Sequence, residues 1–227
     1  MNVFQMLRFP DIVSILNLLF GIGSISAAHY GDFNLALILL LLAAVADGAD
    51  GYIARKFSGG ELGEQMDSLA DAVSFGVAPS LIINFNFGEE GLLVPIFSGF
   101  YALCGVLRLA RFNVVSNKKT GFEGLPITAG CVMLAAYLLI GPRFFRIDFL
   151  LALTLFLSFL MVSTLAYPKV KNIKILAFVA LVFGVTVLLF FIDLQYMQLF
   201  SFVPFILMLT YIFSPFLNIP MLSNIKK

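Results

Sequence analysis

Stretches without a charged side chain recur along the sequence, and they constrain the fold more than any other feature. An α-helix needs about 20 mostly apolar residues to cross the hydrocarbon core of a membrane. Seven charge-free stretches approach or exceed that length: Ile12–Gly31, Ala72–Gly88, Gly91–Leu107, Gly124–Pro142, Phe149–Pro168, Ile175–Ile192 and Leu194–Ile225. An eighth, Phe33–Ala46, reaches it only if its helix continues through Asp47, Asp50 and Arg55.

The composition supports a membrane protein. A soluble domain is about half apolar and about a quarter charged, whereas this chain of 227 residues is 61% apolar and 12% charged. A water-soluble globule and a disordered chain are therefore excluded, and the net charge of +1 gives no basic surface for nucleic acid. We predict an all-α, polytopic membrane bundle of about eight transmembrane helices, forming one membrane-embedded domain over residues 1–227, with additional helices in residues 127–227.

The distribution of Lys and Arg indicates an orientation, because cytoplasmic loops carry an excess of these residues. With the amino terminus in the cytoplasm and eight spans, 12 of the 14 basic residues fall on the cytoplasmic side. Only Arg143 and Arg146 fall outside. The sequence thus predicts a multi-pass protein of the cytoplasmic membrane.

Two neighbouring predicted helices carry aspartates where a membrane helix should have none. Asp47 and Asp50 are three residues apart, and Asp67 and Asp71 are four apart, so each pair shares one helix face. The two pairs are about equally distant from a predicted turn at residues 58–60. In an antiparallel hairpin, positions equidistant from the turn lie at the same level, so we expect the four carboxylates to form a cluster.

Four carboxylates within a membrane require compensation, because desolvation and mutual repulsion both disfavour their charges. Carboxylate oxygens suit hard divalent cations, and two such ions would neutralise four aspartates. Two such ions can also clamp a phosphate during displacement. The alternatives are a structural polar network with Arg55 and Lys56, and a transporter with an acidic relay. A relay should continue across the membrane, whereas these acids gather near one side.

The pattern around the aspartates resembles the signature of the CDP-alcohol phosphotransferase family. It has eight fixed positions and reads Asp47-x-x-Asp50-Gly51-x-x-Ala54-Arg55, then, after seven residues, Gly63-x-x-x-Asp67-x-x-x-Asp71. The segments Asp67–Ser80, Arg108–Asn113 and Phe122–Pro126 are similar to the phosphatidylserine synthase branch of that family. The resemblance covers roughly residues 45–126.

The resemblance implies transfer of a phosphatidyl group from CDP-diacylglycerol to L-serine, with release of CMP, by a homodimeric enzyme of class 2.7.8 facing the cytoplasm. It also implies residue roles. Two divalent cations, Mg²⁺ or Mn²⁺, are expected at Asp47, Asp50, Asp67 and Asp71. The CDP site is expected at Asp50, Gly51, Ala54, Arg55, Gly63 and Asp67. Asp71 is expected to be the general base that takes the proton of the alcohol.

Several alternatives remain open within this interpretation. Glycerol 3-phosphate, inositol or inositol phosphate would use the same signature, and the donor is either an ester lipid or an archaeal ether lipid. Arg108 and Arg111 are three residues apart, so one of them is a candidate for the serine carboxylate; otherwise they are topological charges. Phe122–Pro126 forms either a re-entrant turn or a plain loop. Asn17, in mid-span, either faces the nucleotide or bonds another helix.

Overall fold

The computed structural model describes residues 8, 11–56, 61–115, 122–168 and 173–217, and gives residues 50–56 as backbone only. This part of the chain is almost entirely helical. Its first four segments are α2 (Asp11–His29), α3 (Phe33–Lys56), a long helix made of α4 (Glu61–Asp71), the π-helical η1 (Ala72–Val77) and α5 (Ala78–Phe87), and α6 (Leu93–Val115). The short 3₁₀ helix η2 (Gly88–Glu90) follows α5.

The second half of the described chain adds four more segments. They are α7 (Ile127–Leu139), α8 (Ile147–Val162), α9 (Ile173–Ile192), and the pair α10 (Leu194–Phe200) and α11 (Phe202–Leu217). Five of the eight segments are long and apolar enough to cross a membrane, and three shorter apolar helices lie among them. The predicted all-α membrane bundle is confirmed, and the protein is a multi-pass membrane protein.

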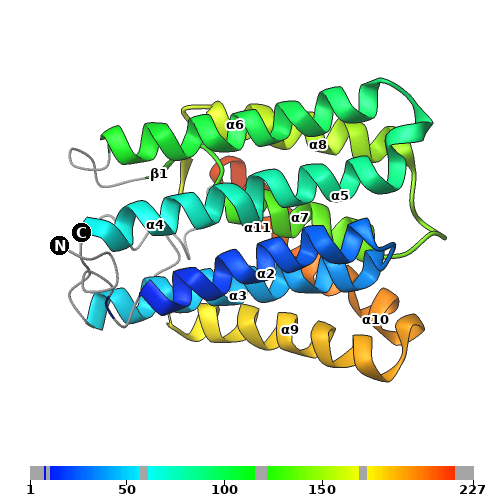
Figure 1. Ribbon diagram of the computed structural model, residues 1–227, viewed down its shortest axis with the longest axis horizontal. Helices are drawn as coiled ribbons and strands as arrows, with labels where there is room; N and C mark the ends of the chain where they lie inside the picture. The colour runs from blue at the N-terminus through cyan, green and yellow to red at the C-terminus, as the bar shows by residue number, and fades with distance from the viewer. Residues whose placement is uncertain (1–7, 9–10, 57–60, 116–121, 169–172, 218–227) are drawn as a thin grey trace.

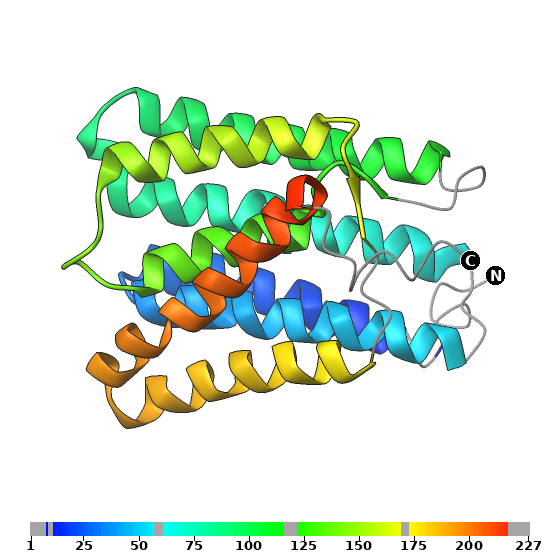
Figure 2. The same cartoon turned by 180° about the vertical axis from the view of Figure 1, so that it is seen from behind.

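The helices run roughly along one common axis (Figure 1). The α6–α8 pair lies along one edge, the α4–α5 helix lies next to it, and α2 packs on α3, with α9 on the far side of α3. Seen from behind, α11 crosses α7 obliquely (Figure 2). All residues of α7 except Thr128 are buried, so α7 is the central helix of the bundle.

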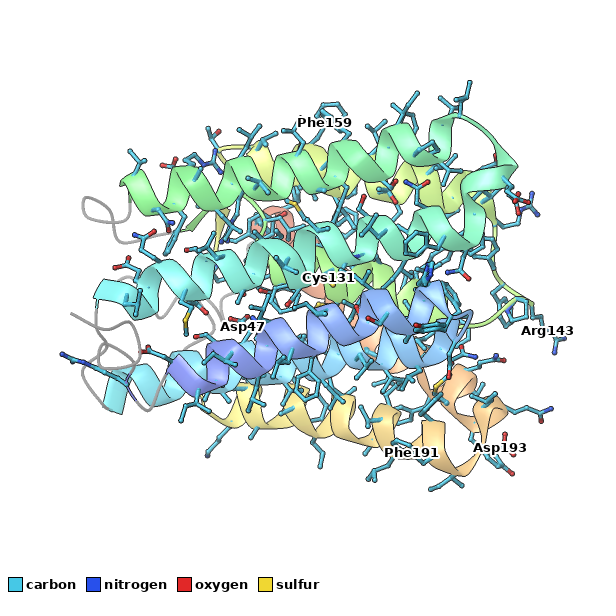
Figure 3. The ribbon with its side chains drawn as sticks, viewed as in Figure 1. Asp47, Cys131, Arg143, Phe159, Phe191 and Asp193 are labelled. Atoms are coloured by element: carbon cyan, nitrogen blue, oxygen red, sulfur yellow. The ribbon has the colours of Figure 1, made fainter. Side chains whose placement is uncertain are left out.

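The outer surface carries large apolar side chains, as expected where lipid is the solvent. Phe159 is 55% exposed and Phe191 is 75% exposed, and both point outward (Figure 3). Arg143 and Asp193 lie at the end of the bundle opposite to the end where α4 begins. Charged groups of the described chain thus gather at the two ends or in the interior, and apolar groups cover the sides.

Two predicted spans differ in detail from the observed helices. The stretch Phe149–Pro168 is helical only to Val162, and Ala166–Tyr167 then forms the strand β2. This strand pairs antiparallel with β1 (Phe122–Glu123), Phe122 opposite Tyr167. The stretch from Leu194 is broken at Ser201. Apolar composition alone does not reveal either break, because the residues at both breaks are themselves uncharged.

The long α4–α5 helix widens into the π-helical turn η1 directly after Asp71. A π-helical turn displaces the ordinary i→i−4 hydrogen bonds, and such turns are frequent at functional sites. Side chains from other helices bond its backbone: the Tyr101 hydroxyl donates to the carbonyl oxygen of Phe75 at 3.2 Å. The hydroxyl of Ser74 donates to the carbonyl oxygen of Asn17 in α2, at 3.0 Å. Neighbouring helices therefore hold the segment that follows Asp71.

Candidate active site

Three of the four predicted aspartates converge in the interior of the bundle. Asp47 extends from α3, and Asp67 and Asp71 extend from α4. One carboxylate oxygen of each lies within 4.8 Å of the other two. Asp71 is buried and the other two are half-buried, and Figure 3 shows Asp47 in the space between the helices. Asp50 is on the next turn of α3, and its side chain is not among the described parts of the structure.

The separation of these oxygens fits a divalent cation. Oxygen ligands lie about 2.0–2.6 Å from Mg²⁺ or Ca²⁺, so two oxygens on one ion are at most about 4–5 Å apart. The three observed carboxylates satisfy this limit with little movement. Oxygen-only donors also match hard cations rather than zinc. When bound, such an ion supplies positive charge for a phosphate and for a departing nucleotide.

Two neutral side chains hold two of the carboxylates. The hydroxyl of Thr128, in the first turn of α7, donates to Oδ2 of Asp47 at 3.0 Å. The amide nitrogen of Asn17, in α2, donates to Oδ1 of Asp71 at 3.0 Å. Sequence reasoning missed Thr128, which has no distinguishing signal in an apolar stretch. It singled out Asn17 as a polar residue in mid-span but left its partner open.

The other signature residues lie at the ends of the same two helices. Gly51, Ala54 and Arg55 are in the last turns of α3, where their side chains fall outside the described part. Gly63 is in the first turn of α4, and a Cβ there would lie 2.5 Å from Oδ1 of Asp11. Glycine therefore lets α4 approach the start of α2. The buried Asp11, which also accepts from the backbone N–H of Arg8 at 2.7 Å, was not singled out from the sequence.

The two candidate arginines have different surroundings. Arg108 is only 6% exposed, lies within electrostatic reach of Asp71 and Asp47, and stacks over the ring of Phe112 with 5.6 Å from Cζ to the ring centroid. Arg111 instead donates to four backbone carbonyl oxygens at 2.6–3.2 Å, those of Glu123, Met161, Val162 and Ser163. The Arg111 guanidinium thus caps the carboxyl end of α8, whereas Arg108 is buried within electrostatic reach of the acidic cluster.

Residues 122–126 connect the end of α8, where Arg111 binds, to the acidic cluster. The N–H of Gly124 donates to the carbonyl of Leu165 at 2.8 Å, and that of Leu125 to Leu160 at 3.0 Å. Gly124 has φ +82°, and a Cβ there would lie within 3.1 Å of the backbone of Met161, so only glycine fits. Pro126 then starts α7. The segment fixes the position of the first turn of α7 and of the threonine that bonds Asp47.

An apolar groove runs between α3 and α9. Its volume is about 250 Å³. The residues that line it are Ala44, Val45, Gly48, Ala49, Leu176, Ala177, Val179, Ala180 and Phe183. Gly48 directly follows Asp47 in the chain. A carboxylate cluster and a surface fit for hydrocarbon thus lie on one stretch of α3.

A buried cluster of hard oxygen ligands within an all-helical membrane bundle could hold a divalent metal ion, as a membrane-embedded, metal-dependent phosphotransferase would require. Comparison with known proteins agrees. The family model described as CDP-alcohol phosphatidyltransferase matches residues 7–166. The chain is 36% identical over 175 residues to an archaetidylserine synthase of Methanothermobacter thermautotrophicus, covering 75% of this chain and 74% of that protein.

Two further relatives carry the name CDP-diacylglycerol–serine O-phosphatidyltransferase. The protein of Methanocaldococcus jannaschii is 35% identical over 172 residues, covering 75% of this chain and 79% of the relative. That of Helicobacter pylori strain 26695 is 33% identical over 195 residues, covering 77% and 81%. The chain belongs to the CDP-alcohol phosphatidyltransferase family, as the signature indicated. It is an enzyme of class 2.7.8, similar to the phosphatidylserine synthases.

Proposed function

We propose that this protein transfers a phosphatidyl group, or its archaeal ether equivalent, from a CDP-lipid to the hydroxyl of L-serine and releases CMP. The convergence of the Asp47, Asp67 and Asp71 carboxylates carries the proposal. The names of the relatives support serine as the acceptor, and one of them supports an ether-lipid donor. Either donor presents the same pyrophosphate to the cluster, so the chemistry is shared.

The aspartates have two roles in this proposal. Asp47, Asp50, Asp67 and Asp71 hold two divalent cations, Mg²⁺ or Mn²⁺, which supply countercharge to the pyrophosphate. Asp71 also takes the proton of the serine hydroxyl, a weak nucleophile near neutral pH that needs a positioned base. Gly51, Ala54, Arg55 and Gly63, with Asp50 and Asp67, line the CDP site. Attack on phosphorus is direct, and CMP departs with the electrons of the broken P–O bond.

Arg108 is the better of the two candidates for serine recognition. It is buried within electrostatic reach of Asp71 and Asp47, and a guanidinium can bind a carboxylate in a bidentate manner. Arg111 is already engaged with backbone carbonyls. We therefore assign the serine carboxylate to Arg108 and a structural role to Arg111. The site faces the cytoplasm by the distribution of basic residues, and the homodimer and the single domain over residues 1–227 belong to the same proposal.

The groove between α3 and α9 suits the hydrocarbon chain of the donor. Its lining is apolar and mostly small, and it includes Gly48, the residue that follows Asp47 in the chain. A lipid whose pyrophosphate is held at the cluster needs such a path to the bilayer. Water-soluble serine and CMP need a separate path to the cytoplasmic end.

A direct test measures CMP release by the purified protein in detergent with CDP-diacylglycerol, CDP-archaeol, Mn²⁺ and each candidate alcohol. The proposal expects release that depends on L-serine. Release only with glycerol 3-phosphate, inositol or inositol phosphate would reject serine but retain the reaction class. No release with any of these alcohols and either donor would reject the proposal.

Asp71→Asn is the variant that tests the proposed base. Its turnover should fall at least about 100-fold, because a positioned base contributes about 10²–10⁴ to the rate. CDP affinity, measured by calorimetry, should change only a few-fold, since three other carboxylates remain. Near-normal turnover of this variant would contradict the assignment of Asp71 as base.

A further inference from the structure

Asn17 is buried at a position where its side chain amide contacts the acidic cluster. It has no exposed surface, and its Nδ2 lies 3.0 Å from Oδ1 of Asp71. An ionised carboxylate accepts hydrogen bonds but donates none, so the amide must present its NH₂ group to Asp71. This leaves Oδ1 of Asn17 facing away, buried and without a hydrogen-bond partner in the described part of the chain.

An unsatisfied buried acceptor is unfavourable for folding, because the group has lost water and gained nothing. An apolar residue of the same size would avoid that cost in a membrane helix. The side chain bond that Asn17 makes within the described residues is the one to Asp71. The role of Asn17 is therefore its hydrogen bond to Asp71, and not a contribution to the stability of the fold.

The surrounding backbone fixes Asn17 independently of its side chain. The hydroxyl of Ser74, three residues after Asp71, donates to the carbonyl oxygen of Asn17 at 3.0 Å. One turn further along α2, a Cβ at Gly21 would lie 2.8 Å from Cα of Ser74, so the two helices touch closely there. The α2 helix and the π-helical turn η1 thus form a rigid frame around the Asn17–Asp71 bond.

We propose that Asn17 is a positioning residue for the reaction: its amide fixes the carboxylate of Asp71 so that the remaining lone pairs face the acceptor hydroxyl and the other acids of the cluster. This inference rests on the proposed function. Asn17 touches neither the alcohol nor the phosphorus in this account. It acts by holding one oxygen of the base in place before substrate arrives.

Asn17→Leu tests this, because leucine fills the same space without a donor. We expect kcat to fall about 100-fold, the scale of losing a well-positioned base, with KM for the CDP-lipid and CDP affinity within about threefold. The thermal midpoint in detergent should fall by a few degrees at most, because removing the orphaned acceptor of Asn17 offsets part of the cost of leaving Oδ1 of Asp71 without this donor. Asn17→Ala, which also removes the donor, should lower kcat to a similar extent.

Ser74→Ala is the matched control, since it removes a bond of the same frame and leaves the amide intact. Its thermal midpoint should fall while kcat stays within about threefold of the wild type, a change small against the losses typical of catalytic groups. Near-normal kcat in Asn17→Leu would overturn the inference, as would equal losses of kcat in Asn17→Leu and Ser74→Ala. If Asn17→Leu fails to fold, the kcat of Asn17→Ala decides, and a value near that of the wild type overturns the inference. A wild-type protein that releases no CMP would instead reject the proposed function itself.

Discussion

Each carboxylate of the cluster depends on contacts that are distant in sequence. Asp47 is bonded by Thr128 and Asp71 by Asn17, across 81 and 54 residues respectively. The spacing of the aspartates alone predicts that they share helix faces and meet across a hairpin, and the structure brings three of them together. It cannot reveal Thr128, because a threonine in an apolar helix gives no signal until the packing of that helix is known.

The two arginines that look equivalent in sequence should respond oppositely to substitution. Arg108→Gln should raise KM for serine about 10- to 100-fold, since a charged bidentate contact is lost, with a modest change in thermal midpoint. Arg111→Gln should destabilise the protein by about 2 kcal/mol, because it removes hydrogen bonds from a charged group to the end of α8, while KM for serine stays near the wild-type value.

Serine kinetics and thermal unfolding in detergent separate these effects. Asn113→Ala serves as the control for nonspecific loss, because Asn113 is on the same helix as both arginines and accepts a half-buried hydrogen bond from the Ser68 hydroxyl of α4. If Arg111→Gln raised KM for serine and left the thermal midpoint unchanged, the assignment of the two arginines would be reversed.

Helix ends and irregular turns determine how the elements of this bundle meet. The Asp71 carboxylate directly precedes the π-helical turn η1, and α7 starts near Asp47 because Gly124 and Arg111 fix the residues before it. Charge-free runs predict where membrane helices lie, but they carry no information on a π-helical turn or a two-residue strand. The strand depends on backbone pairing with β1, and the π-helical turn accepts a hydrogen bond from the Tyr101 side chain; in both cases the partner is far away in the sequence.

The groove between α3 and α9 gives a prediction at the same scale. Ala180→Phe places a large ring in the groove and should raise KM for a long-chain CDP-lipid about tenfold, the scale of overpacking an apolar site. Affinity for CDP, which has no lipid chain, should stay within about twofold. Leu181→Phe is the matched control, because Leu181 is the next residue of α9, is 64% exposed and does not line the groove. Equal effects of both substitutions on KM would place the lipid chain elsewhere.

At the scale of the whole molecule, the acidic cluster lies inside a bundle whose outer surface is apolar. The hydropathy of the sequence predicts a membrane bundle of about eight helices, and the structure confirms it, with five segments long and apolar enough to span a membrane and three shorter apolar helices among the described residues. The orientation of the bundle, by contrast, comes from basic residues in connecting segments and stays a prediction. So do the acceptor, the donor and the homodimer, which depend on surfaces that hydropathy does not describe.

The most direct test of the central claim is the number of Mn²⁺ ions that the purified protein binds, measured by electron paramagnetic resonance titration in detergent with CDP present. The account predicts two ions per chain, with loss of at least one in Asp47→Asn and in Asp67→Asn, and no loss in the control Glu89→Gln, which changes an exposed acid of η2. Mn²⁺ binding that is equal in the wild type and both aspartate variants would contradict it.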